Sequence, residues 1–177
     1  LRRLVPSECG RQRINTVTRL PPLTKVTAAL RDVFGAAEGG RDYNATWIPD
    51  SLLRNVYLPP FHAACEAGVA TFMSAFNDLN GVPATGNTLT LRRILRNEWK
   101  FDGFVVSDWD SVIEMVRHGY AADAKDAALK GVQAGTDMEM SSNAYHGNLK
   151  ALVEVGRLRP ALIDESVRNI LRIKVIA

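Results

Sequence analysis

The sequence LRRILRNEWKFDGFVVS, residues 91–107, places a helix directly before a short apolar strand. Its first half has one apolar helical face, because apolar side chains recur three, four and eight positions after the first: Leu91, Ile94, Leu95 and Trp99. Its second half, residues 101–107, is a short aromatic and β-branched run typical of buried strands. We therefore predict a helix that packs on a sheet containing the strand that follows it.

The same order of helix and strand recurs along the chain. Two further apolar runs, 68–75 and 134–140, also begin near a glycine that ends the preceding helix, as is typical of short loops leading into strands. Helices are expected at 123–133, where Asp123 suits the N-cap, and at 160–175, where Pro160 suits the first turn. This alternation predicts an α/β fold with parallel strands.

Residues 1–34 have a different composition, rich in Arg, Thr and Pro, with only a weak helical stretch near residues 23–30. The first 30 residues hold six basic groups and one acidic group, a net charge of +5, so the other 147 residues sum to −2. We expect 1–34 to be an atypical basic segment with little order and 35–177 to be the folded domain. The first 30 residues contain no aromatic side chain for base stacking, so nucleic acid is not an expected partner.

The overall composition is that of one globular domain: 177 residues, 46% of them apolar and 23% charged. No apolar run approaches the ~18–20 residues of a membrane span, and the first residues do not resemble a secretory signal, so no membrane partner is expected. The compartment stays open between periplasmic, secreted and cytoplasmic. No metal or organic cofactor is expected, because nucleotide-binding glycine motifs are absent and the Cys and His residues lack metal-ligand spacing: Cys9, Cys65, His62, His118 and His146.

Asp108 follows the strand predicted at 101–107. The carboxyl ends of parallel strands form the active-site edge in βα architectures, so a carboxylate there is a candidate catalytic group. The alternative is that Asp108 or Asp110 caps the next helix. Ser111 and Glu114 have the spacing of a capping box, which would leave both aspartates without that role. From the residues alone, a catalytic and a structural Asp108 remain equally balanced.

Several motifs in order along the chain resemble the barrel domain of glycoside hydrolase family 3 β-glucosidases. The two longest are FMSAFNDLNGVPATGN at 72–87 and LRRILRNEWKFDGFVVSDW at 91–109; shorter matches are GAAEGGRDYN at 35–44, YLPPF at 57–61 and HGYAAD at 118–123. The resemblance implies a partial (β/α)8 TIM-type barrel that contains the last three βα units. It also implies that 35–177 is the N-terminal domain of this family.

The same resemblance implies roles for individual residues. Asp108 matches the nucleophile of a retaining enzyme, and Trp109 matches the aromatic residue beside it. Met73 and Phe76 match the wall of the sugar pocket, where Phe76 often is a Tyr that adds a hydrogen bond. Arg41 could contact the substrate or could instead pair with Asp42 within its loop. A plain core role remains the alternative for Trp109 and for Met73.

Two features depart from the family pattern. The family has a sugar-binding Lys-His pair just before the 35–40 segment, whereas residues 29–34 read ALRDVF. A complete barrel also needs about 250 residues, and the general acid/base usually comes from a following domain. We therefore expect this chain to be part of a longer protein, with the missing parts of that protein as its partners. No residue of this chain is nominated as the acid/base.

The function expected from these observations is hydrolysis of terminal β-D-glucosyl residues with retention, through a covalent intermediate on Asp108. The substrate would be a small carbohydrate, a β-glucoside or a related sugar such as a xyloside. Two alternatives stay open: a truncated, catalytically inactive fragment of such an enzyme, and a noncatalytic sugar-binding piece.

Overall fold

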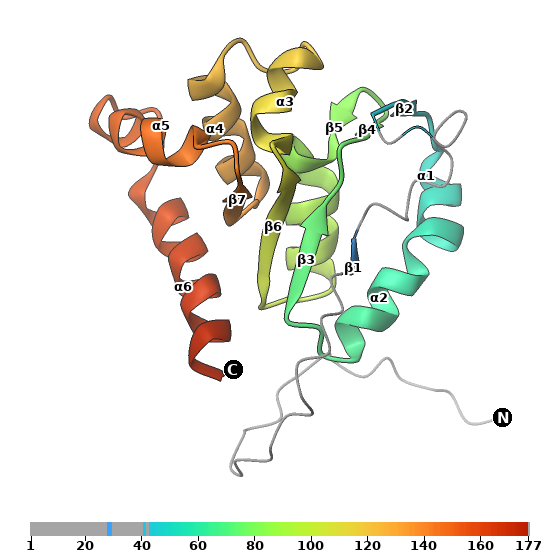
Figure 1. The fold of residues 1–177 in the computed structure, drawn as a ribbon. Coiled ribbons are helices and arrows are strands. Elements are labelled where there is room, and N and C mark those ends of the chain that lie inside the picture. The colour runs from blue at the N-terminus through green and yellow to red at the C-terminus, as the bar shows by residue number, and fades with distance from the viewer. Residues whose placement is uncertain (1–27, 30–40, 42, 177) are drawn as a thin grey trace, which may run out of the picture.

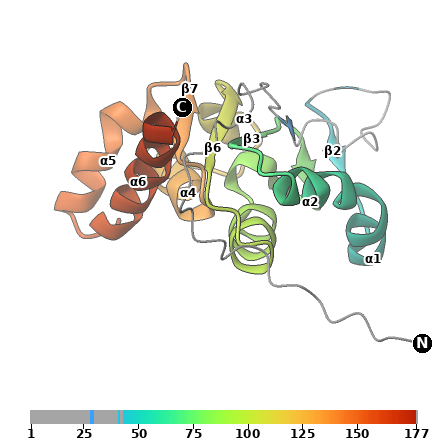
Figure 2. The same cartoon turned by 90° about the horizontal axis from the view of Figure 1, so that it is seen from below.

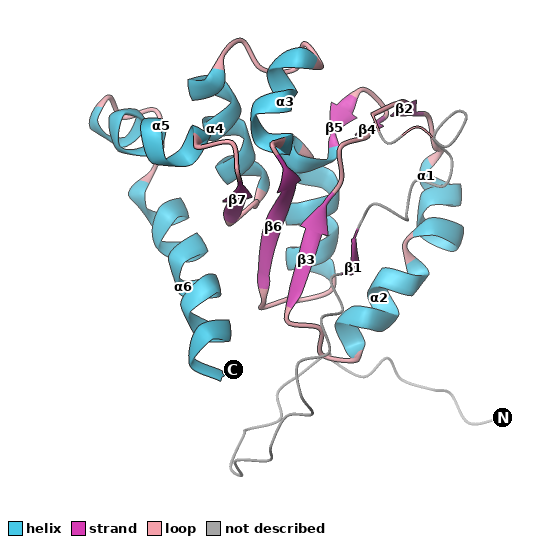
Figure 3. Cartoon of the chain, in the orientation of Figure 1, coloured by secondary structure: helices cyan, strands magenta, loops and turns pink. Residues whose placement is uncertain are grey.

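The computed structural model describes residues 28–29, 41 and 43–176, which form an α/β fold (Figures 1 and 3). Among these residues, no helix is long and apolar enough to cross a membrane. The elements are, in chain order, β1 (Ala28–Ala29), β2 (Ala45–Thr46), α1 (Asp50–Leu52), η3 (Leu53–Tyr57), α2 (Pro59–Glu66), β3 (Thr71–Ser74), β4 (Asp78–Leu79), β5 (Val82–Pro83), η4 (Ala84–Gly86), η5 (Leu89–Glu98), β6 (Phe104–Trp109), α3 (Ser111–Arg117), α4 (Ala124–Ala134), β7 (Met138–Met140), α5 (Ala144–Glu154) and α6 (Pro160–Ile176).

The main sheet has four parallel strands in the order β1-β3-β6-β7. The three predicted strands are confirmed as β3, β6 and β7, and they are spatial neighbours in their sequence order. The predicted end of the second strand is wrong, because β6 continues past Ser107 to Trp109. The weak helical stretch predicted near residues 23–30 is also wrong at residues 28–29, because these two residues form β1, a strand that pairs with β3. The rest of 1–34 lies outside the described residues, so the boundary after residue 34 stays a prediction.

A second, small sheet, in the order β2-β4-β5, lies beyond the end of β3 and was not predicted. Its antiparallel strands β4 and β5 are joined by Asn80-Gly81, and both residues have positive φ (52° and 80°). An Asn-Gly pair with this conformation is the favoured two-residue hairpin turn. The Asn80 side chain also accepts from Ile48 N at 2.8 Å and donates to Ile48 O at 2.9 Å, which holds the chain after β2 against the hairpin.

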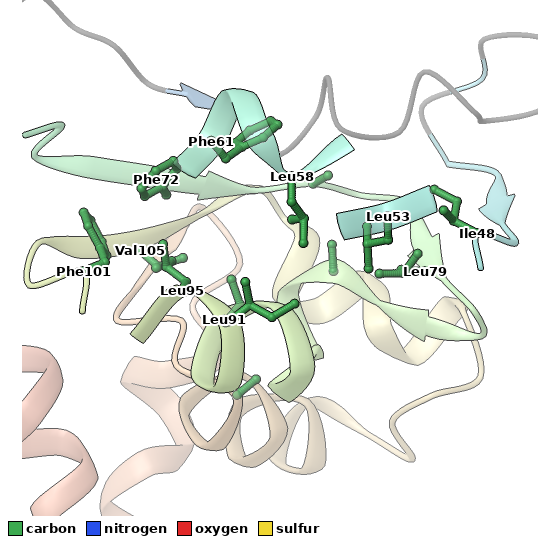
Figure 4. Close-up of a cluster of buried hydrophobic side chains, with 14 residues drawn as sticks. Ile48, Leu53, Leu58, Phe61, Phe72, Leu79, Leu91, Leu95, Phe101 and Val105 are labelled. Carbon is green, nitrogen blue, oxygen red and sulfur yellow. The ribbon is translucent and has the colours of Figure 1, made fainter. Parts of the chain in front are cut away.

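The helices cover one face of the central strands. Seen from below, α4, η5 (the yellow-green helix) and α2 follow one another along one side of β3 and β6 (Figure 2). Strand burial agrees, because Phe72 and Val105 are fully buried whereas Met73 and Val106, which alternate with them, are only half-buried. In Figure 4, Leu91 and Leu95 of η5 point toward the strands and join this core, as the periodicity predicted; Trp99 packs against its edge.

The predicted helices at 123–133 and 160–175 are confirmed as α4 and α6. Asp123 caps α4 as expected, because its Oδ1 accepts from Asp126 N at 2.8 Å. These helices and α3 and α5 enclose a second apolar cluster that is separate from the one under η5. Its fully buried members are Val112, Met115, Ala127, Ala128, Val132, Leu152 and Leu158.

One buried ion pair joins four of these elements. Arg96 of η5 pairs with Asp137, the residue before β7, and their side chains are only 9% and 2% exposed. Asp137 Oδ2 also accepts from Val105 N of β6 at 2.7 Å, and Oδ1 accepts from Asn169 Nδ2 of α6 at 3.1 Å. Arg96 Nη1 donates to Gly103 O at 2.7 Å. Burial raises the pKa of Asp137 and lowers the pKa of Arg96, and each partner's charge opposes the shift of the other.

We expect Arg96→Met to lower the free energy of unfolding by about 3–5 kcal/mol, because it leaves the Asp137 carboxylate buried without its cation. Arg93 of the same helix is the control: its side chain is 70% exposed and lies 3.7 Å from Glu98, so Arg93→Met should change stability by about 0.5 kcal/mol or less. Urea denaturation monitored by circular dichroism measures both. Equal midpoints for the two variants would show that the buried pair does not hold these elements together.

Candidate active site

Asp108 lies near the carboxyl end of β6, on the face that the helices leave uncovered. Burial alternates along β6: Val105 and Ser107 are fully buried, while Phe104, Val106 and Asp108 are half-buried. Because side chains alternate between the two faces of a strand, Asp108 shares the half-exposed face. Its Oδ1 accepts from Trp109 N at 2.7 Å, a local bond that orients the carboxylate. A carboxylate held in this way can accept a proton or attack an electrophilic carbon.

Three of the other predicted residues lie at the end of β3 or next to it. Met73 is paired in register with Val106, two residues before Asp108, and is half-buried. Phe76 follows β3, and its ring centroid lies 4.7 Å from that of Tyr43. The exposed Arg41 is in the same loop as Tyr43. The structure therefore brings Met73, Phe76 and the Arg41 loop to the same edge of the sheet as Asp108.

The environment of Trp109 excludes a plain core role, because its side chain is 62% exposed. Met73 also lies outside the fully buried core. Asp42, the expected alternative partner of Arg41, and residues 30–34 of the segment that departs from the family pattern lie outside the described residues.

Asn77 and Tyr43 complete this edge and were missed by the sequence analysis. Asn77 is 3% exposed, and its Nδ2 lies 3.4 Å from Arg41 O and 3.3 Å from Asn44 O. Its backbone carbonyl accepts from Ala84 N at 2.9 Å. Asn77 thus fastens the 41–44 loop, which includes Tyr43, to the end of β3. A polar residue directly after a buried strand was the available signal, but nothing local identified its partner 33–36 residues earlier.

The predicted capping box at Ser111 and Glu114 is wrong. The α3 N-cap is Asp110, in a left-handed conformation and without a side-chain cap. The Ser111 side chain is instead buried, and its Oγ lies 2.8 Å from Thr85 Oγ1 of η4. The conclusion drawn from the box still holds, since neither Asp108 nor Asp110 caps α3 with its side chain.

Glu114 is a buried acid close to Asp108. It is 9% exposed, and its Oε2 has no hydrogen-bond partner in the described part of the chain. Burial raises the pKa of Glu114; Arg117 and His118 oppose the shift, and the charges of Asp110 and Asp108 add to it. Next to this acid, His118 Nδ1 lies 2.7 Å from Asp78 Oδ1 of β4.

Within residues 28–29, 41 and 43–176, no group of three His, Cys, Asp or Glu side chains is arranged to hold a metal ion. His62 packs against Trp99 with ring centroids 5.0 Å apart, and His118 contacts Asp78.

Comparison with known proteins gives one consistent answer. Residues 27–173 match the glycosyl hydrolase family 3 N terminal domain. A periplasmic beta-glucosidase of Salmonella typhimurium is 40% identical over 141 residues, which are 80% of this chain and 18% of that protein. A beta-xylosidase of Formosa agariphila is 38% identical over 162 residues, covering 84% of this chain and 22% of the relative.

Solved structures agree with these relatives. A beta-glucosidase from Listeria innocua in complex with glucose superimposes with a TM-score of 0.81 at 40% identity, over 84% of this chain and 20% of that one. The same enzyme has been solved with isofagomine, and a mutant of it with laminaribiose. The chain spans about a fifth of the length of the relatives it matches.

We expect Glu114→Gln to become progressively more stable than the wild type as the pH rises. Since the folded-state pKa of Glu114 is raised, the stability that its proton provides is fully present below the unfolded pKa of about 4.3 and is lost as the pH rises through the higher folded pKa. Gln does not titrate, so the difference in free energy of unfolding between the variant and the wild type should grow in favour of Gln as the pH rises above the unfolded pKa of Glu.

Urea denaturation at several pH values measures this difference. Glu66→Gln, at an exposed glutamate of α2, is the matched control and should show no such growth. A stability difference for Glu114→Gln that does not depend on pH would contradict the assigned burial of this carboxyl.

Proposed function

The chain belongs to glycosyl hydrolase family 3, and on that premise we propose that it contains the nucleophile of a retaining exo-β-glycosidase, Asp108. The enzyme hydrolyses terminal β-D-glucosyl residues of small glycosides. The observation on which the proposal depends is the position of Asp108: a half-buried carboxylate, oriented by the Trp109 amide, at the uncovered edge of a parallel sheet. That edge is where βα enzymes bind their substrates.

The chemistry needs two carboxyl groups about 5–5.5 Å apart. Asp108 attacks the anomeric carbon and forms a covalent glycosyl-enzyme, while the second group, as an acid, protonates the departing oxygen. The same group then acts as a base toward the water that releases the sugar. We assign this second role to a residue outside this chain, since the chain corresponds to about a fifth of the relatives' length.

The side chains around Asp108 support a sugar as the substrate. The exposed ring of Trp109 offers an apolar surface to a pyranose face, and Met73 and Phe76 form a wall at the end of β3. Arg41, from the loop that Asn77 fastens, can donate to sugar hydroxyls. Phe76 has no hydroxyl, so it binds through its ring alone. Because the relatives are beta-glucosidases and beta-xylosidases, we propose β-linked glucose or xylose as the sugar that is bound.

The proposal includes the finer architecture. We assign β3, β6 and β7 to the last three strands of a (β/α)8 barrel, with residues 35–177 as the family domain. All four strands of the main sheet are parallel, and the helices cover the face opposite Asp108, as the outer helices of such a barrel would.

We expect Asp108→Asn to reduce hydrolysis of a chromogenic β-glucoside on the order of 10⁴-fold or more, because it removes the nucleophile. The assay uses this chain extended at both ends by the adjoining coding sequence, beside the chain alone. Asp110→Asn is the matched control: it removes a neighbouring carboxylate and keeps a residue type that tolerates the left-handed conformation at this position (φ 57°). It should retain most of the activity.

Labelling with a 2-deoxy-2-fluoro-β-glucoside, followed by peptide mass spectrometry, identifies the nucleophile directly. Trapped sugar on Asp108 is the expected result. An extended protein that binds glucose saturably in the wild type and in Asp108→Asn, without turnover in either, would instead identify a sugar-binding piece and overturn the enzymatic proposal.

A further inference from the structure

The ladder between β6 and β7 contains an irregularity at the candidate nucleophile. Val106 is opposite Met138 and Trp109 is opposite Met140, so β6 advances three residues while β7 advances two. The extra residue lies at Ser107–Asp108. A bulge of this kind leaves backbone groups unpaired and changes the direction of the side chains next to it.

Ser107 supplies one of the missing hydrogen bonds. Its side chain is fully buried, and its Oγ accepts from Met140 N at 2.8 Å and donates to Asp108 O at 2.9 Å. A serine hydroxyl has one proton and two lone pairs, so both bonds can exist together. The hydroxyl thus takes the place of a backbone acceptor for Met140 and holds the carbonyl of Asp108 itself.

Two amides that follow the bulge also have partners. Trp109 N donates to Asp108 Oδ1 at 2.7 Å, and Asp110 N donates to Met140 O at 2.9 Å. The backbone of Asp108 is therefore fixed on one side by the Ser107 hydroxyl and on the other by the bond between Asp110 and Met140. Without the hydroxyl, the Met140 amide would lose its acceptor, and the bulge would lose a bond that opposes a shift of β6 along β7.

We propose that Ser107 is a positioning residue: its hydroxyl stabilises the bulge that directs Asp108 toward the substrate. The inference rests on the proposed role of Asp108 as nucleophile. Such a shift of β6 would move the attacking oxygen, and a misplacement of about 1 Å can reduce a reaction rate by about 10²-fold.

Ser74 provides a matched control. It is the register partner of Ser107 on β3, and its side chain is equally buried. Its hydroxyl, however, lies 2.8 Å from Thr85 Oγ1 and makes no bond to the bulge. Ser74→Ala therefore removes a buried serine hydroxyl at the same height of the sheet without affecting the ladder between β6 and β7.

The first measurement uses the chain as it is. Ser107→Thr keeps the hydroxyl, and Ser107→Val replaces it by a methyl group of the same size, so the pair differs only in the hydrogen bonds. We expect the Met140 amide to exchange with solvent about tenfold faster or more in Ser107→Val than in Ser107→Thr, as observed by NMR. Ser74→Ala should leave this amide at the wild-type rate once global stability is taken into account.

The second measurement uses the extended protein and the rate at which the fluorosugar labels Asp108. We expect Ser107→Val to react about 10²-fold more slowly than Ser107→Thr, and Ser74→Ala to remain within about threefold of the wild type. If the bulkier variants fail to fold, Ser107→Ala against the wild type gives the same comparison without added volume.

The outcomes separate the two proposals. If Asp108 is labelled at equal rates in Ser107→Thr and Ser107→Val, the positioning role of Ser107 is overturned and the role of Asp108 as nucleophile stands. This holds even if the Met140 amide exchanges faster in Ser107→Val. Equal exchange at Met140 in the two variants overturns it as well. Labelling of the wild type at another residue overturns the proposed function first, and the positioning role with it.

Discussion

The buried pair of Arg96 and Asp137 is the interaction on which the arrangement of the strands depends. A carboxylate and a guanidinium removed from water need hydrogen bonds, and here Asp137 accepts from β6 and α6 while Arg96 of η5 donates to Gly103 O; in the described part of the chain only the Nε atom of this guanidinium has no partner. Because Asp137 accepts from Val105 N, the residue before β7 is held beside the second residue of β6. This contact sets the register in which β7 begins beside β6.

The two ends of the sheet differ in what their polar groups do. At the amino end, the charges of Arg96 and Asp137 are almost fully buried and pair with each other. At the carboxyl end, the Asp108 carboxylate remains half-exposed beside an exposed Trp109, and a buried serine hydroxyl takes over a ladder bond. This division agrees with the general pattern of parallel βα folds, in which one edge provides stability and the other binds the substrate.

Local periodicity was enough to predict the central elements. β3, β6 and β7 and the helices η5, α4 and α6 were predicted because each is an apolar run or stripe whose partners need not be known. The capping box at Ser111 failed for the opposite reason: Thr85, 26 residues away, competes for the same hydroxyl. The two-residue strands β1 and β2 are too short for any pattern, and they exist only because β3 and β4 pair with them.

The sequence by itself determined the α/β class, the helix that covers β6, the family, and Asp108 as the carboxylate at a strand end, because these depend on the order of residues along the chain. Tertiary structure alone decided that Trp109 is exposed, that Asn77 fastens the loop of Tyr43, that Glu114 is buried, and that Ser107 holds the bulge. Each of these depends on hydrogen bonds or burial between segments about 30 or more residues apart, or on which face is covered, and no local pattern encodes such a pairing.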